Sequence, residues 1–210
     1  MKAAIFDMDG TLLDSMDCWQ KLNLAYVHSL GIVPNEKQHK ELYNLSGSLM
    51  IPYLKREFGV DAEFSTLLHS ACTAIEDDYR RGLPLKPGAA AYLDRLKTRG
   101  IKRVLATATP AKQALVALNQ SGLTAHLDFI FSTEMLGLQK HCVEFYDALC
   151  DFIGEEKEDC VMFEDALYAM QGARKAGLGV IGITDPTNEF DRPDMLRVCD
   201  RVISSYDELE

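Results

Sequence analysis

Short apolar runs alternate with helical patterns along most of the chain. The first run occupies residues 3–6 and leads directly into an acidic segment. Short apolar runs bounded by turn residues are typical of buried strands in parallel sheets. Later runs of the same character occupy residues 104–106, 129–131, 160–163 and 180–183. We therefore expect each of these runs to form a strand.

Segments with helical periodicity lie between these strands. They cover residues 89–99, 111–121, 142–153 and 166–176. Each segment is followed by a glycine, and glycine just past the last turn is a common helix stop signal. Alternation of strands and helices predicts an α/β fold with a doubly wound parallel sheet, in which ligands bind beyond the carboxyl ends of the strands.

A long stretch between residues 15 and 83 breaks this alternation. Its apolar positions, such as Trp19, Leu22 and Val27, follow helical spacing, and no clear strand is present. The segment after it, residues 83–88, contains two prolines, which disfavour helix and indicate an extended return linker. We predict a small all-helical cap domain of residues 15–83, inserted into a core domain made of residues 1–14 and 84–210.

Composition and charge narrow the class of protein. With 47% hydrophobic and 26% charged residues among 210, the chain has the composition of a folded globular protein. A net charge of -10 without any basic run argues against a nucleic-acid partner, whereas a small anionic ligand needs only local positive charge. The acidic residues soon after Met1 leave no space for a signal peptide, and no apolar segment reaches the roughly 20 residues of a membrane span. We expect a cytoplasmic protein with no membrane partner.

The cysteines and histidines give no sign of a soft-metal or redox centre. The chain has six cysteines and five histidines, but it has no C-x-x-C pair and no paired zinc-ligand spacing. We interpret the cysteines as reduced thiols, most of them packed inside the protein. No histidine-based motif accompanies Ser15, so a serine hydrolase is also rejected.

The first strand ends in two aspartates, Asp7 and Asp9, that share one face if the backbone stays extended. A polar turn is the simpler interpretation, because Asp, Gly and Thr are common turn residues. The functional interpretation is that Asp7 attacks a phosphate ester and forms an aspartyl-phosphate. Asp9 would then donate a proton to the departing oxygen and later accept one from the attacking water. Gly10 permits the turn that follows.

Two further positions favour binding of an anion. Thr107 ends a predicted strand just before a helix with Pro110 near its start, where backbone amides and the helix dipole favour negative charge. Thr107 and the amide of Ala108 could therefore hold a phosphoryl group, although a threonine there can also serve as a cap. Lys140 precedes the predicted helix 142–153 and could balance charge between nucleophile and phosphate, whereas a lone lysine is usually a solvated surface group.

A second pair of carboxylates, Glu164 and Asp165, follows the predicted strand 160–163. These residues could cap the next helix. Alternatively they meet Asp7 at the carboxyl edge of the sheet, where so many like charges require a cation. Mg²⁺ prefers oxygen ligands in near-octahedral geometry, so we expect a Mg²⁺ site there. Glu164 would bind directly or through water.

Residues 6–15, Phe-Asp-Met-Asp-Gly-Thr-Leu-Leu-Asp-Ser, resemble the first signature of the haloacid-dehalogenase-like phosphatases. Thr107, Lys140 and the pair Glu164-Asp165 resemble the three later signatures, in the same order. One departure is that the family usually continues Lys-Pro, whereas this chain reads Lys140-His141. The resemblance implies a Mg²⁺-dependent phosphohydrolase with a helical cap. The implied catalytic residues are Asp7, Asp9, Thr107 and Lys140, the phosphate-binding residues are Thr107, Ala108 and Lys140, and the metal-binding residues are Asp7, Asp9 (through its carbonyl), Glu164 and Asp165.

Two absences bear on the substrate. The β-phosphoglucomutase group usually has a histidine twelve positions after the nucleophile, where this chain has Trp19, and a cap arginine, which residues 46–50 do not supply. We therefore expect hydrolysis of a small phosphorylated metabolite, by a monomer or weak homo-oligomer. The alternatives are a sugar phosphomutase and a catalytically silent protein that binds a phosphorylated metabolite. Positive charge could still come from cap residues such as Lys55 or Arg80.

Overall fold

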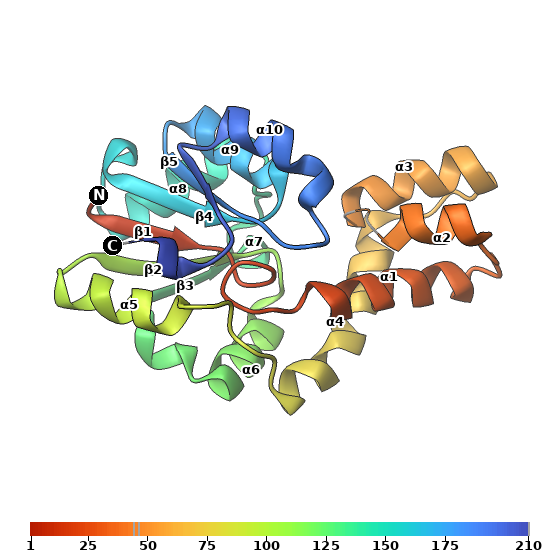
Figure 1. Cartoon of the computed structure of the whole chain (residues 1–210), viewed down its shortest axis with the longest axis horizontal. Helices are drawn as coiled ribbons and strands as arrows, with labels where there is room; N and C mark the ends of the chain where they lie inside the picture. The colour runs from red at the N-terminus through yellow and green to blue at the C-terminus, as the bar shows by residue number, and fades with distance from the viewer. Residues whose placement is uncertain (44, 46, 210) are drawn as a thin grey trace.

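A parallel β-sheet forms the centre of the protein (Figure 1). The computed structural model describes residues 1–43, 45 and 47–209. Across these residues the sheet has six strands in the order β3-β2-β1-β4-β5-β6, and every neighbouring pair is parallel. The strands are β1 (Ala3–Phe6), β2 (Lys102–Thr107), β3 (Phe129–Ser132), β4 (Cys160–Glu164), β5 (Gly179–Ile183) and β6 (Arg201–Ile203). The predicted parallel sheet is confirmed.

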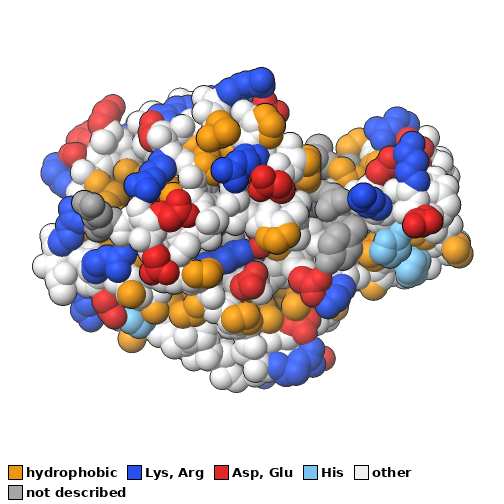
Figure 2. Space-filling model, viewed as in Figure 1, with side chains coloured by type: hydrophobic (Ala, Val, Ile, Leu, Met, Phe, Trp, Pro, Cys, Tyr) orange, Lys and Arg blue, Asp and Glu red, His pale blue; other side chains and the backbone are white. Residues whose placement is uncertain are grey.

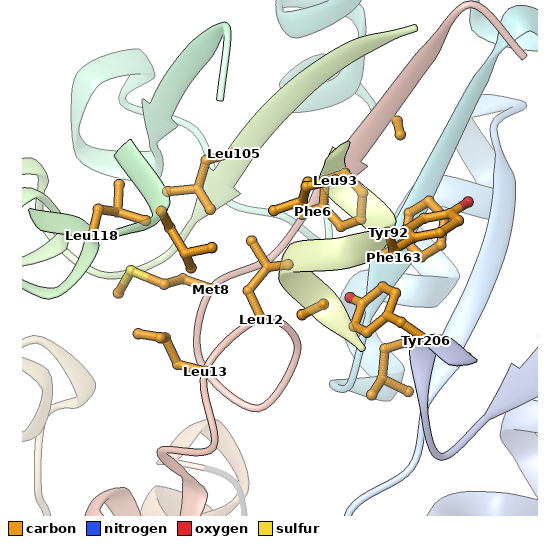
Figure 3. Close-up of a cluster of buried hydrophobic side chains, with 14 of the residues drawn as sticks. Phe6, Met8, Leu12, Leu13, Tyr92, Leu93, Leu105, Leu118, Phe163 and Tyr206 are labelled. Atoms are coloured by element: carbon orange, nitrogen blue, oxygen red, sulfur yellow. The ribbon is translucent and has the colours of Figure 1, made fainter. Parts of the chain in front are cut away.

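Helices cover both faces of this sheet, as a doubly wound fold requires. The predicted helices correspond to α5 (Ala89–Thr98), α6 (Ala111–Ser121), α8 (Val143–Ile153) and α9 (Leu167–Ala176). Side chains alternate along β1: Ala4 and Phe6 belong to a cluster with α5 and α6, whereas Ala3 and Ile5 belong to a cluster with α8 and α9. Figure 3 shows the first of these clusters around Phe6. β1 is therefore buried on both faces.

Sequence reasoning missed several short elements. The strand β6 is three residues long and starts with the exposed Arg201, so it has no apolar run to identify it. The helix α7 (Thr133–Leu136) is a single turn, capped by the Ser132 hydroxyl, which accepts a hydrogen bond from the Met135 amide. Also unpredicted were α10 (Arg192–Val198) and the 3₁₀ turns η1 (Leu123–His126), η2 (Lys157–Asp159), η3 (Glu189–Asp191) and η4 (Tyr206–Glu208).

The segment after β1 is helical, as its apolar spacing predicted. It contains α1 (Met16–Ser29), α2 (Glu36–Tyr43), α3 (Gly47–Phe58) and α4 (Phe64–Arg81), which lie to one side of the sheet (Figure 1). Buried side chains of these helices, including Val27, Met50 and Leu54, form a hydrophobic cluster of their own. The end of α4 differs, because Ile75 and Tyr79 belong instead to the cluster around Phe6.

The two chain segments that lead into and out of these helices pair with each other. The Asp14 amide donates to the Pro84 carbonyl and the Lys86 amide donates to the Leu12 carbonyl, both at 2.9 Å. The ammonium of Lys86 contacts the carboxylate of Asp185 and lies 3.3 Å from that of Asp14. Both Lys86 and Asp185 are buried, so this ion pair fixes the return linker to the loop after β5.

Charged side chains of both signs are interspersed on the surface in view. On the face shown in Figure 2, Lys and Arg side chains are scattered among acidic ones and form no single basic patch. In the part of the chain that the structure describes, no helix combines the length and apolar character needed to cross a membrane.

The buried ion pair gives a stability prediction. We expect Asp185→Asn to lower the free energy of unfolding by about 3 kcal/mol, because it leaves the buried Lys86 ammonium without its closest carboxylate. The matched control is Asp147→Asn, which removes a half-exposed pair with Lys157 and should cost under about 1 kcal/mol. Urea unfolding measures both values, and equal losses would contradict the importance of the Lys86 pair.

Candidate active site

Three buried carboxylates meet at the carboxyl edge of the sheet. Phe6 pairs with Phe163 in the β1–β4 register, and the Asp7 amide donates to the Phe163 carbonyl at 3.0 Å. This pairing places Asp7 beside Glu164 and Asp165, and each of the three offers a carboxylate oxygen within 4.8 Å of the others. The loop after β1 and the end of β4 are far apart in the sequence. For example, Thr11 and Asp165, which lie close together here, are separated by 154 positions.

The position of Asp165 depends on a glycine. Gly10 has φ +77°, and a Cβ built on it would lie 2.2 Å from Asp165 Oδ2. Any larger residue would therefore displace this carboxylate. Thr11 Oγ1 lies 3.4 Å from Asp165 Oδ1, and the Asn188 side-chain amide donates to the Asp165 carbonyl at 2.9 Å. The loop after β1 and the loop after β5 thus hold Asp165 from two sides.

The ammonium of Lys140 lies among these carboxylates. It contacts Asp7 Oδ1 and lies 2.9 Å from Glu164 Oε2, and its side chain is only 2% exposed. The backbone at Lys140 is also fixed, because the Tyr146 hydroxyl lies 2.8 Å from its carbonyl oxygen. Gly172 allows this close packing, since a Cβ there would lie 2.1 Å from the same oxygen. The chain thus holds Lys140 in place although His141 replaces the usual proline.

Burial and the neighbouring charges shift the pKa values of the side chains in this cluster. Burial, with further contributions from Glu164 and Asp9, raises the pKa of Asp7 to about 8, although Lys140 acts in the opposite direction. The pKa of Asp165 is raised well above its ordinary value, first by burial and then by Glu164 and Asp7. Burial opposes the charged form of Lys140, but Asp7 and Glu164 outweigh it and raise the pKa of the ammonium, so this group stays protonated. One cation therefore faces three carboxylates.

This donor set fits a hard divalent cation. All three side chains offer carboxylate oxygens, and their separation within 4.8 Å allows a single ion to contact them. A divalent charge would offset the excess of negative charge that Lys140 alone leaves. Asp7, Glu164 and Asp165 can therefore hold a metal ion. The Asp9 carboxylate lies outside this group, and metal binding through the Asp9 carbonyl stays a prediction.

Thr107 ends the strand next to β1. Because Phe6 pairs with Leu105, Thr107 lies just beyond the pairing, on the side toward Asp7. Thr107 is 1% exposed, and its hydroxyl accepts a hydrogen bond from the Thr109 amide at 3.0 Å. Pro110 then precedes α6 as its N-cap residue, and Ala108 is half-buried in the turn between Thr107 and Pro110. The roles of Thr107 and Ala108 in binding phosphate stay predictions.

The carboxylate of Asp9 has partners of a different kind. Ser15 Oγ donates to Oδ1 at 2.7 Å, Thr109 Oγ1 donates to Oδ2 at 2.8 Å, and Tyr79 Oη lies 2.8 Å from both oxygens. Sequence reasoning missed all three contacts. Ser15 belongs to the first signature and Thr109 follows Thr107 by two residues, so both gave some local signal. Tyr79 gave none, because it lies 70 residues from Asp9 in the sequence.

A family model described as haloacid dehalogenase-like hydrolase matches residues 1–177. The chain belongs to this family, as the four signatures predicted. Among curated relatives, the phosphorylated carbohydrates phosphatase of Thermotoga maritima is 24% identical over 190 residues, which cover 90% of this chain and 88% of the relative. Hexitol phosphatase A of Escherichia coli is 28% identical over 214 residues, covering 99% and 93%. The prediction of an enzyme of the haloacid-dehalogenase-like phosphatase class is confirmed.

Solved structures support the same fold. CbbY from Rhodobacter sphaeroides, in complex with phosphate, aligns with a TM-score of 0.79 at 20% identity and covers 100% of this chain and 96% of its own. A putative β-phosphoglucomutase from Thermotoga maritima aligns with a TM-score of 0.71 at 22% identity, covering 97% and 94%. The fold of this chain is therefore shared with both of these structures.

The raised pKa of Asp7 predicts how pH affects stability. Its folded pKa of about 8 exceeds its ordinary value of 3.8, so the stability that this proton contributes is complete below about pH 4 and is lost as pH rises through about 8. A divalent ion competes with the proton for the carboxylate. We therefore expect Mg²⁺ to raise the melting temperature more near pH 8 than near pH 6. Thermal unfolding with Mg²⁺ or EDTA measures this, and equal shifts at the two pH values would contradict it.

Proposed function

We propose that the protein is a Mg²⁺-dependent phosphohydrolase that cleaves a small-molecule phosphate monoester through an aspartyl-phosphate. The supporting observation is the buried group of Asp7, Glu164 and Asp165 around Lys140. Burying three carboxylates around one ammonium is costly unless a bound ligand supplies further positive charge. Hydrolysis of a phosphate monoester by the proposed route uses both a cation and a nucleophile at one place.

In the proposed reaction, an oxygen of the Asp7 carboxylate forms a bond to phosphorus while the ester P–O bond breaks. Asp9 donates its proton to the departing alcohol oxygen. In the second step Asp9 takes a proton from water, the water oxygen bonds to phosphorus, and the Asp7 O–P bond breaks to release inorganic phosphate. Together, the two steps return both aspartates to their starting protonation.

A metal ion and a few residues would neutralise the negative charge of the phosphoryl group. Mg²⁺, held by Asp7, the Asp9 carbonyl, Glu164 and Asp165, would supply positive charge to the phosphate oxygens. Lys140 contacts Asp7, so its ammonium can offset repulsion between this carboxylate and the anionic substrate. Thr107 Oγ1 and the Ala108 amide would bind the remaining phosphate oxygens, near the start of α6.

The segment 15–83 is proposed to act as a cap domain over this site. Its own hydrophobic cluster supports a unit that packs separately from the sheet. The paired segments around Asp14 and Pro84 connect it to the core, residues 1–14 and 84–210. A cap in this place would exclude bulk water and contact the leaving group, so we assign selection of the substrate to it.

A phosphorylated carbohydrate or polyol is the proposed substrate class. Two relatives, the phosphorylated carbohydrates phosphatase and hexitol phosphatase A, support this choice. Hydrolysis is preferred to mutase chemistry because Trp19 takes the place of the mutase histidine and residues 46–50 contain no arginine. Residues 44 and 46 lie outside the described part of the chain, so this second point depends on the sequence alone. A cytoplasmic monomer or weak homo-oligomer stays a prediction.

The nucleophile is tested directly by substitution. We expect Asp7→Asn to lower kcat by about a thousandfold or more, because the carboxamide is a far weaker nucleophile. Assays follow phosphate release from p-nitrophenyl phosphate and a panel of sugar and polyol phosphates with Mg²⁺, and EDTA should abolish the activity. The control Asp151→Asn changes an exposed carboxylate on α8 and should leave kcat unchanged. Full turnover by Asp7→Asn would contradict the proposal.

Product analysis separates hydrolysis from mutase chemistry. With a sugar phosphate and a catalytic amount of the matching bisphosphate, we expect inorganic phosphate to be the main product. The reason is that a phosphorylated Asp7 should react with water, which the mutase cycle has to prevent. Phosphorus NMR measures both outcomes. Conversion to an isomeric sugar phosphate with little phosphate release would favour the mutase, and ligand binding without turnover would favour a silent binding protein.

A further inference from the structure

The side chain of Tyr79 connects the end of α4 to the carboxylate of Asp9. The phenol oxygen lies 2.8 Å from both Asp9 Oδ1 and Oδ2, a placement that fixes the plane of the carboxylate as well as its distance. Ser15 and Thr109 approach one carboxylate oxygen each. Tyr79 is therefore the partner best placed to control rotation of the Asp9 side chain.

The position of Tyr79 is fixed by packing of α4 on the core. Tyr79 is 0% exposed and shares a hydrophobic cluster with Met8 and Leu13, which flank Asp9 in the chain. Polar contacts join α4 to α6 three residues before Tyr79 and one residue after it: Gln113 Nε2 lies 3.4 Å from Glu76 Oε2, and Gln120 Nε2 donates to the Arg80 carbonyl at 2.8 Å. These contacts hold the phenol of Tyr79 next to Asp9.

We propose that Tyr79 is a positioning residue for Asp9, which aims its carboxyl group at the oxygen of the leaving group. This inference rests on the proposed function, in which Asp9 protonates that oxygen. An acid that transfers a proton has to lie within hydrogen-bond reach of the acceptor with the correct orientation. Tyr79 does not itself react. It restricts the rotations of Asp9, and it belongs to the last helix of the inserted segment, so the position of that segment and the orientation of the acid are linked.

The dependence on leaving group distinguishes this role from simple packing. A p-nitrophenolate ion leaves with little need for a proton, whereas phenolate is a stronger base and depends more on the acid. We expect Tyr79→Phe to lower kcat for phenyl phosphate by about tenfold, the upper end of what the loss of one hydrogen bond produces. The loss for p-nitrophenyl phosphate should be severalfold smaller. Asp9→Asn should show the same pattern with larger losses.

The experiment compares the full-length wild type, Tyr79→Phe, Asp9→Asn and the double variant on both esters with Mg²⁺. The double variant should match Asp9→Asn, because Tyr79 acts only through Asp9. Tyr53→Phe is the matched control, because it also removes the hydroxyl of a buried tyrosine in the helical segment. This hydroxyl donates to Glu41 Oε2 at 2.8 Å, and its loss should leave both rates unchanged. Thermal unfolding of each variant monitors the fold.

The possible failures are distinguishable. Equal losses of Tyr79→Phe on the two esters, or additive losses in the double variant, would overturn the positioning role and leave a structural one, while the proposed function stands. Equal losses of Asp9→Asn on the two esters would reject Asp9 as the acid and the Tyr79 inference with it. Absence of phosphate release by the wild type from both esters would overturn the proposed function itself.

Discussion

Burial of several carboxylates around one ammonium is the constraint on which this site depends. Asp7, Glu164 and Asp165 are almost fully buried, and the ammonium of Lys140 lies among them. Such an arrangement is unfavourable by itself, as the raised pKa of Asp7 and Asp165 indicates. A divalent cation would offset this repulsion, so the same charges that oppose burial suit the group to a metal and an anionic phosphate.

The parallel sheet meets this constraint by bringing distant segments together. β1 and β4 are neighbours in the sheet, and their carboxyl ends deliver Asp7 and Glu164 to the same edge. Close packing then sets the finer geometry: Gly10 leaves space for Asp165, and Gly172 leaves space for the backbone at Lys140. Substitution of either glycine would therefore disturb the site without removing any of its charged groups.

Most of the fold could be predicted from the sequence because its central strands are buried on both faces and carry continuous apolar runs. β6 escaped this pattern, since it lies at the edge of the sheet and begins with an exposed arginine. The charged members of the site follow strand ends and were therefore identifiable, although Lys140 could be assigned only from its order among the signatures. Its support by Tyr146 and Gly172, and the contact of Tyr79 with Asp9, depend on tertiary packing that no local pattern records.

Chemical trapping of the intermediate tests the central claim that Asp7 captures the phosphoryl group. The enzyme is mixed with p-nitrophenyl phosphate and Mg²⁺, quenched during turnover and reduced with borohydride, which converts an aspartyl-phosphate to homoserine. Peptide mass spectrometry then locates the modified residue. We predict homoserine at position 7 in the wild type and none in Asp7→Asn. Modification of a different aspartate, or no modification while phosphate is being released, would contradict the account.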